Sequence, residues 1–547
     1  MKNSFSDVKP NTSRTRFTAP NWQMDVMAGF LVFLIALPLC LGIAVASGFP
    51  PMAGIISAIV GGLLVSRING SCLTITGPAA GLIVVILTSV ESLGEGNAID
   101  GYRFTLAAIV LAGLLQIVLG YFKAGRLAAF FPNSVVHGML AAIGIIIVTK
   151  QLPVMVGVQI QGGGILSDIA LIPHALTYFV PKVAVIALVG LVILVGWPQL
   201  QQPWLTKIPA PILVIVSGML LGRLVGLGQL QPEPLFRMPD DLLIGGSVLV
   251  SISESLLSSM VLPDFGKLAS LSFWESVISI CLVGSLESLL SAAAVDKLDP
   301  QKRYTDLNRD LTAVGVGNTV SGMLGGLPMI AEIVRSSANI DAGAQSGWAN
   351  FFHGAFLLVF VLLFPALIGS IPLASLAALL VYTGFRLASP QAFARTMDLG
   401  AEQLAIFLVT IAGILASNLL AGVASGIFTK LLLHLVRGVP IRSLLSISYR
   451  LQQQSGDVWV VSVIGSAIFS NFVSLKSELA ALPDGRTVIF DLSNADLIDH
   501  TVMEFIDHYC DDYIERGGRC EIIGLSEHRA YGDHELAARK RNTDVAG

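Results

Sequence analysis

Two short segments that are interrupted by glycine and proline have a pattern suited to binding an anion. They run from Leu73 to Gly81 and from Leu324 to Ala331, each within an apolar stretch. An extended stretch that leads into a half-helix leaves backbone N–H groups unpaired inside a membrane, and these groups, with the positive end of the helix dipole, favour an anion. Proline suits the first helical turn, where its missing N–H costs little. We therefore predict an anion site at the two segments; ordinary helix kinks are the alternative.

Charged residues near these segments are the next candidates, because a charge inside a bilayer is costly and usually functional. Arg335 follows the second segment and could add positive potential to an anion site, or it could pair with Glu332 to join two helices. Glu287 and Ser291 are four residues apart, so they share a helix face and could bind Na⁺ or carry a proton. Glu332 is a second cation-coupling candidate. Either carboxylate could instead be a buried structural group.

The sequence contains no P-loop, no HExxH and no nucleophile elbow, so we expect neither an enzyme nor a bound cofactor. Without a nucleotide site in the chain, uphill transport would depend on a gradient of Na⁺ or H⁺. The net charge of -4 gives no indication of a nucleic-acid partner.

Composition indicates that most of the chain faces lipid. Of the 547 residues, 54% are apolar and 13% charged, about half the charged fraction of a soluble domain, and the mean hydropathy is +0.76. Charge is concentrated at the C-terminus, where 24 of 70 charged residues lie from Asp457 onward. The predicted organisation is an N-terminal cytoplasmic segment (1–20), a transmembrane domain (21–437), a linker (438–456), a soluble domain (457–530) and a tail (531–547).

Fourteen apolar segments are predicted to span or partly span the bilayer, several of them shorter than the ~20 residues of a full span. They are Met24–Ser47, Met52–Val65, Cys72–Leu87, Thr105–Tyr121, Val135–Thr149, Val183–Val195, Ile212–Val225, Phe273–Val295, Leu311–Leu324, Pro328–Asn339, Asn350–Ile368, Leu373–Phe385, Leu404–Ser417 and Ala421–Val436. Lysine and arginine concentrate before the first segment and after even-numbered ones, which places both termini in the cytoplasm.

The C-terminal part reads as a small α/β layer domain. We expect strands at Val458–Ile464, Thr487–Asp491 and Cys520–Ile523, and helices at Phe472–Leu482 and Thr501–Arg516. Five cysteines occur without CxxC spacing, so no zinc site or disulfide framework is expected, and all five are predicted to be small buried hydrophobes.

The chain resembles the SulP family of anion transporters. The residues that carry the resemblance are Leu37-Pro38 to Gly48, Thr76-Gly77-Pro78, Glu287-Ser288-Leu289-Leu290-Ser291, and Gly326-Leu327-Pro328 to Arg335 and Asn339. The soluble part resembles the STAS domain of that family at Asp491-Leu492-Ser493, Ile498-Asp499 and Thr501. The resemblance implies an all-α polytopic membrane domain, a seven-plus-seven inverted repeat with core and gate parts, followed by an α/β STAS domain. It also implies a homodimer in the bacterial inner membrane and an elevator-like movement of the core.

The resemblance assigns roles to particular residues. The anion site would comprise Thr76, Gly77, Pro78, Ala79, Ala331, Ile333 and Arg335. Glu287 and Ser291 match residues that hold Na⁺ in the bicarbonate branch, although that branch has aspartate at the position of Glu287. Ile333 replaces a polar residue and Glu332 a small one, which raises the prospect of proton coupling. Thr501 matches a phosphorylated position of other STAS proteins, but Asp499 and Thr501 lie where a helix begins, so helix capping explains them without regulation and is the stronger explanation.

The sequence therefore predicts a secondary active transporter of a small inorganic anion, with bicarbonate first and sulfate a close second. A dicarboxylate carrier of the same fold and an anion channel are the alternatives. A signalling scaffold anchored by the spans is a third reading, which the paired broken segments disfavour. The expected partners are the anion, the lipid bilayer, a second copy of the chain, and a cytoplasmic protein on the STAS domain.

Overall fold

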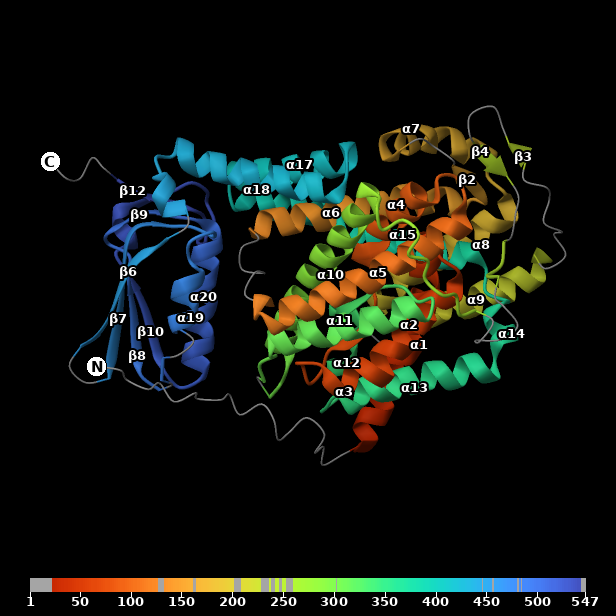
Figure 1. Ribbon diagram of the computed structural model, residues 1–547, viewed down its shortest axis with the longest axis horizontal. Helices are drawn as coiled ribbons and strands as arrows, with labels where there is room; N and C mark the ends of the chain where they lie inside the picture. The colour runs from red at the N-terminus through yellow and green to blue at the C-terminus, as the bar shows by residue number, and fades with distance from the viewer. Residues whose placement is uncertain are drawn as a thin grey trace. The chain divides into compact units, whose positions relative to one another are not determined.

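The computed structural model describes residues 22–125, 132–160, 164–200, 208–227, 236–237, 242–244, 248–251, 259–301, 303–444, 446–454, 457–479, 482–483 and 485–542. The predicted segment 1–20 lies outside the described residues. The chain divides into two compact units, one of Met1–Gly125 and Ile143–Arg386 and the other of Arg126–Ala142 and Leu387–Gly547. Each is described by itself (Figure 1).

The first unit is almost entirely helical. Its helices are α1 (Trp22–Ala46), α2 (Pro51–Val60) continued by η1 (Gly61–Val65) and α3 (Ser66–Ile68), η2 (Ala80–Leu82), α4 (Ile83–Gly94), α5 (Ala98–Tyr121), the later part of α6 (Asn133–Met155), α7 (Ile165–Ala175), η4 (Leu176–Tyr178), α8 (Pro181–Gly196), η5 (Trp197–Gln199), α9 (Ala210–Leu224), α10 (Leu271–Leu298), α11 (Leu307–Met323), α12 (Ile333–Asp341), α13 (Trp348–Leu363), α14 (Pro365–Ile368) and α15 (Leu373–Leu387). Its strands are β1 (Ile75–Pro78), β2 (Val158–Ile160), β3 (Phe236–Arg237), β4 (Leu242–Ile244) and β5 (Met329–Glu332).

Every predicted span contains helix in the structure, and eight helices among the described residues are long and apolar enough to cross a membrane. The third and tenth predicted spans differ from the others, because each begins as a strand, β1 or β5, before becoming helical. Two helices, α7 and α16 (Pro390–Asp398), were not predicted, and neither was the sheet of order β2-β4-β3. Short amphipathic segments of this kind lack the apolar length by which spans are recognised.

The second unit holds the start of α6, the helices α16, α17 (Ala401–Ala416) and α18 (Leu419–Val436), and the C-terminal domain. That domain contains η7 (Ile441–Leu444), β6 (Ser448–Gln454), β7 (Val458–Ala467), α19 (Val473–Leu479), β8 (Thr487–Asp491), β9 (Ala495–Ile498), α20 (His500–Glu515), β10 (Arg519–Ile523), η8 (Leu525–Glu527), β11 (His528–Ala530) and β12 (Arg539–Arg541). Its sheet has the order β10-β8-β7-β9-β12-β11, and β6 pairs with β7. β6 lies in the range predicted as linker and β12 in the range predicted as tail.

The core of this domain lies between the sheet and the helices α19 and α20, which cover one face of it (Figure 1). Strand residues that point toward the helices are buried, as Val461, Val488 and Phe490 are, and they pack against Leu475 and Ile506. The alternation of buried and exposed residues in β8 is the pattern of a strand with one covered face.

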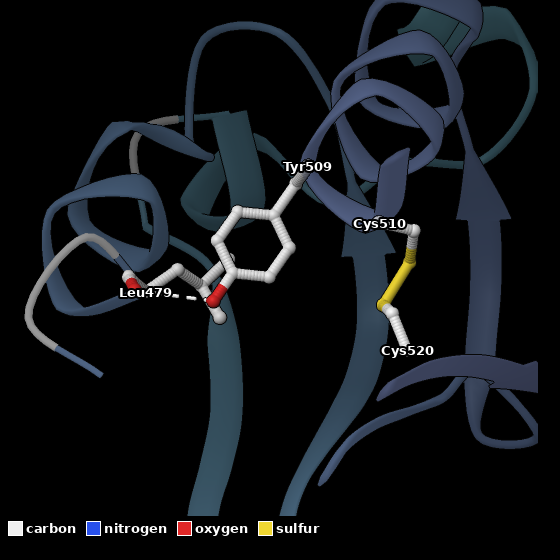
Figure 2. The surroundings of a disulfide bond; sticks show 4 residues. All are labelled: Leu479, Tyr509, Cys510 and Cys520. Carbon is white, nitrogen blue, oxygen red and sulfur yellow. Dashed lines mark hydrogen bonds between the residues drawn. A yellow bond between two sulfur atoms is a disulfide. The ribbon is translucent and has the colours of Figure 1, made fainter. Parts of the chain in front are cut away.

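Two of the five cysteines are bonded, contrary to the prediction that all five are isolated buried thiols. Cys510 of α20 and Cys520 of β10 form a disulfide with their Cα atoms 5.1 Å apart (Figure 2). A spacing of ten residues forms no recognised motif, and only the packing of α20 against β10 brings the two side chains together. Cys40, Cys72 and Cys281 are free, and Cys40 and Cys281 are buried as predicted.

Candidate functional site

The two broken segments meet as a short antiparallel sheet. β1 pairs with β5 so that Ile75 lies opposite Glu332, Thr76 opposite Ala331, Gly77 opposite Ile330 and Pro78 opposite Met329. β1 leads into η2 and α4, and β5 leads into α12, so each strand precedes the N-terminal end of a helix. Segments separated by about 250 residues in sequence are therefore placed at one point of the fold. That the two segments form one anion site stays a prediction, for which the β1–β5 pairing brings them together.

Arg335 reaches this crossing from the first turn of α12. Its side chain is 1% exposed, and its Nη2 donates a hydrogen bond to the carbonyl oxygen of Pro78 at 3.3 Å. The guanidinium lies against Gly77, since a Cβ atom at that glycine would stand 2.4 Å from Nη1. Among the described residues, Nε and Nη1 have no hydrogen-bond partner. A buried cation with free donors is suited to bind an anion.

The ion pair with Glu332, which was the alternative role of Arg335, is not formed. No ion pair joins the two in the described part of the chain, and Oε1 of Glu332 is buried without a hydrogen-bond partner. Glu332 occupies the N-cap position of α12 but makes no side-chain capping bond. Ala331 is fully buried, whereas Ile333 is 41% exposed. Arg335 is thus left available for a ligand.

Polar residues to which the sequence analysis gave no role in the site hold the two strands. Asn350 of α13 donates to Oγ1 of Thr76 at 3.1 Å, and Ser336 of α12 accepts from the backbone N–H of Ile75 at 2.8 Å. Asn339 donates to the carbonyl oxygen of Leu73 at 3.0 Å. The signal that could have found them is a buried polar residue in an apolar span, because such groups need partners in a membrane.

Glu287 lies on α10 beside the start of the first half-helix. Both of its carboxylate oxygens are buried and lack a hydrogen-bond partner among the described residues. A Cβ atom at Gly81 would stand 1.7 Å from Oε1, so only glycine leaves room for the carboxylate there. Ser291, one helical turn further along α10, is half-buried. The arrangement places an unpartnered carboxylate next to the anion segments, where a proton or a small cation would neutralise it.

The cation-coupling candidates do not form a cluster of metal-binding side chains. Within the described ranges, no group of three or more His, Cys, Asp and Glu side chains is placed to hold a metal ion. A Na⁺ ion at Glu287 would therefore take its further oxygen ligands from backbone carbonyls and hydroxyls, of which the Ser291 hydroxyl is the predicted one.

The regulatory candidate Thr501 lies in the second unit, at the start of α20. Asp499 caps that helix, because its Oδ1 accepts from the N–H of Val502 at 2.8 Å. The Oγ1 of Thr501 accepts from Nζ of Lys430 at 3.0 Å, and the same Nζ lies 3.2 Å from Oδ2 of Asp499. Burial alone raises the pKa of Asp499, but the charge of Lys430, the neighbouring His434 and the capped N–H lower it below its usual range. Capping by Asp499 is confirmed, whereas the Thr501 hydroxyl bonds to Lys430 instead of capping the helix. Phosphorylation of Thr501 stays a prediction.

Comparison with known proteins shows which family and which relatives the chain is similar to. The model of the sulfate permease family matches residues 22–410. The bicarbonate transporter BicA of Picosynechococcus is 24% identical over 524 residues, 92% of this chain and 89% of BicA. YvdB of Bacillus subtilis, provisionally named a sulfate transporter, is 24% identical over 516 residues, 93% of this chain and 92% of YvdB.

Two solved structures share the fold. The transmembrane domain of a cyanobacterial BicA aligns with a TM-score of 0.63 at 22% identity, over 76% of this chain and 99% of that one. The murine anion transporter Slc26a9 in its inward-facing state aligns with a TM-score of 0.65 at 17% identity, over 94% of this chain and 90% of that one. The predicted fold class, a polytopic helical membrane domain followed by an α/β domain, is confirmed.

Proposed function

The chain belongs to the sulfate permease family of multi-pass membrane transporters, and from that premise we propose that it is a secondary active carrier of a small inorganic anion, bicarbonate first and sulfate second. The proposal includes coupling to Na⁺ or H⁺ and an elevator-like alternation of access. It also includes a homodimer in the bacterial inner membrane with both termini in the cytoplasm. Dicarboxylate transport on the same fold and channel-like anion conduction are the competing functions.

The proposal rests on the burial of the Arg335 guanidinium and on its unpartnered nitrogens. A guanidinium that is 1% exposed, beside the β1–β5 crossing and with two of its nitrogens unpartnered in the described chain, would be costly without a ligand. An anion bound between the N-terminal ends of α4 and α12 would accept hydrogen bonds from it. The backbone ends of both helices would add to the favourable potential.

The neighbouring carboxylate of Glu332 favours a weakly charged substrate. Glu332 precedes Arg335 by three residues. Coulomb repulsion from this carboxylate acts twice as strongly on a divalent anion as on a monovalent one, and it offsets the attraction exerted by Arg335. This places bicarbonate ahead of sulfate. BicA, named a bicarbonate transporter, and YvdB, provisionally named a sulfate transporter, are similar to this chain at equal identity, so both substrates need testing.

Coupling would follow from the unpartnered carboxylate of Glu287. A buried carboxylate is stable only when a proton or cation neutralises it, and binding of that cation would in turn favour an anion nearby. The two ions would then be carried together. In this mechanism the residues of the chain bind and orient, and no covalent step is needed.

The test is replacement of Arg335 in protein reconstituted into liposomes. We expect Arg335→Ala to abolish uptake of labelled bicarbonate and sulfate while the protein stays folded and inserted. Arg395→Ala, which removes an exposed arginine from α16, is the matched control and should leave uptake unchanged. Wild-type uptake by Arg335→Ala would remove Arg335 from the anion site.

A further inference from the structure

The free edge of β5 is held by two side chains from neighbouring helices. β5 has one strand partner in the described structure, β1, so its other edge would present unpaired N–H groups. Met329 and Ala331 are two residues apart, and their N–H groups point to the same side of the strand. The N–H of Met329 donates to Oδ1 of Asn318 on α11 at 2.6 Å, and the N–H of Ala331 donates to Oγ of Ser288 on α10 at 3.1 Å.

Asn318 is itself fixed by a chain of hydrogen bonds through the buried interior. Its Nδ2 donates to Oε1 of Gln116 on α5 at 2.7 Å, and Nε2 of Gln116 donates to Oγ of Ser285 at 3.2 Å. Ser285 donates to the carbonyl oxygen of Cys281 at 2.5 Å, which ends the chain on the backbone of α10. The helices α5, α10 and α11 that carry these groups lie side by side (Figure 1). Along this chain each residue accepts a hydrogen bond from the residue before it and donates one to the residue after it, so the bonds reinforce one another.

Loss of one of these hydrogen bonds should have a large effect on β5, because the groups that form them are buried. Asn318, Gln116 and Ser288 are each 0% exposed. No water is available inside the bilayer to replace a lost partner, so an N–H of β5 that loses its acceptor must either stay unsatisfied or move to find another.

We propose that Ser288 and Asn318 are positioning residues for the anion site. Neither is expected to touch the anion. They hold the free edge of β5 so that Ala331 and the first turn of α12, which carries Arg335, stay oriented toward the anion. This inference rests on the proposed anion transport and adds the residues that set the affinity for the anion.

Ser288 has a further role because of its position next to Glu287. The Glu287 carboxylate contacts Gly81 in the first broken segment, and the Ser288 hydroxyl binds Ala331 in the second. One turn of α10 therefore touches both segments. A movement of Glu287 when its cation binds is transmitted through Ser288 to β5, which makes the affinity for the anion depend on the cation.

The test is a comparison of Ser288→Ala and Asn318→Ala with wild type in proteoliposomes. Both should raise the KM for the transported anion about tenfold, the equivalent of one lost buried hydrogen bond, and leave the maximal rate within about twofold. Ser288→Ala should also weaken the dependence of KM on the coupling cation. Stabilisation of the detergent-purified protein against heat by added bicarbonate or sulfate should fall in parallel. Ser276→Ala is the matched control, because among the described residues that hydroxyl donates to the carbonyl oxygen of Ser272 in its own helix at 2.9 Å.

The outcomes separate this inference from the proposed function. Wild-type KM in both variants, with uptake abolished in Arg335→Ala, overturns the positioning role and leaves the proposed function intact. Absence of anion uptake by the wild type overturns both. If an alanine variant fails to insert, Ser288→Cys and Asn318→Asp take its place, since each nearly preserves the volume but weakens or breaks one bond of the set. A wild-type KM in these variants also overturns the inference.

Discussion

Replacing Gly81 with alanine should displace the Glu287 carboxylate without altering any charge. The added methyl carbon would stand 1.7 Å from Oε1, 2.3 Å from Cδ and 2.4 Å from Oε2. Ordinary contact begins at 3.4 Å, so the carboxylate must retreat by at least about 1.7 Å. The clashing atoms are the end of a flexible side chain, so we expect the protein to fold with a loss of about 1–3 kcal/mol in unfolding free energy.

The effect of Gly81→Ala on cation coupling should exceed its effect on stability. A cation held by a carboxylate is sensitive to displacements smaller than 1.7 Å, because metal–oxygen distances vary by only a few tenths of an ångström. We expect the stimulation of anion uptake by Na⁺, or by acidic external pH if the coupling ion is H⁺, to fall about tenfold or more. The assay is initial uptake into proteoliposomes over a series of Na⁺ concentrations and pH values.

A compensating change makes the prediction specific. Aspartate is one methylene shorter than glutamate, which draws the carboxylate back by about 1.5 Å. Glu287→Asp should therefore restore cation dependence in the Gly81→Ala background. Gly196→Ala is the matched control, because a Cβ atom there would meet nothing within 4 Å. Unchanged cation dependence in Gly81→Ala would refute the assignment of Glu287 as the coupling group.

Two further predictions concern the second unit. Asp499→Asn should lower the unfolding free energy at neutral pH by about 3 kcal/mol, because it leaves Lys430 buried without its counter-charge. The pKa of Asp499 is depressed in the folded protein, so its ionised carboxylate stabilises the fold fully above the ordinary aspartate pKa of about 3.9, and this stabilisation is lost as the pH falls below that value. The difference in unfolding free energy between wild type and Asp499→Asn, measured by chemical denaturation, should therefore shrink in acid. A difference that does not change with pH would contradict this. Deletion of residues 448–547 should change the transport rate or its regulation without changing the preference between bicarbonate and sulfate, and a switch of preference in competition assays would place part of the anion site in the C-terminal domain.

Much of the architecture could be predicted because it depends on local signals. Apolar length predicted fourteen segments that each contain helix in the structure, and Gly77-Pro78 and Pro328 marked the two that begin as strands. Alternating strands and helices identified the C-terminal domain, although its strands β6, β9, β11 and β12 were missed because they are polar or only a few residues long. The Cys510–Cys520 disulfide was missed because it depends on how α20 packs on β10.

The candidate site was predicted less completely than the fold. The sequence indicated Arg335 and Glu287 because charges in apolar spans are rare. It gave no indication that Arg335 would avoid Glu332 and bind the carbonyl of Pro78. Asn318, Gln116 and Ser288 were not selected either, because a neutral polar residue in a span has no distinctive pattern until its partner is known. Long-range hydrogen bonds are therefore the part of the site that spacing alone does not predict.

The central claim is coupled anion transport through a site formed by Arg335 and Glu287. Its most direct test is uptake of labelled bicarbonate and labelled sulfate into proteoliposomes, each with and without an inward Na⁺ gradient and a pH gradient, for wild type and Glu287→Gln. We predict bicarbonate uptake stimulated by one of the two gradients in wild type, with the stimulation lost in Glu287→Gln. Uptake of either anion that is independent of both gradients and equal in the two proteins would contradict the account and favour a channel.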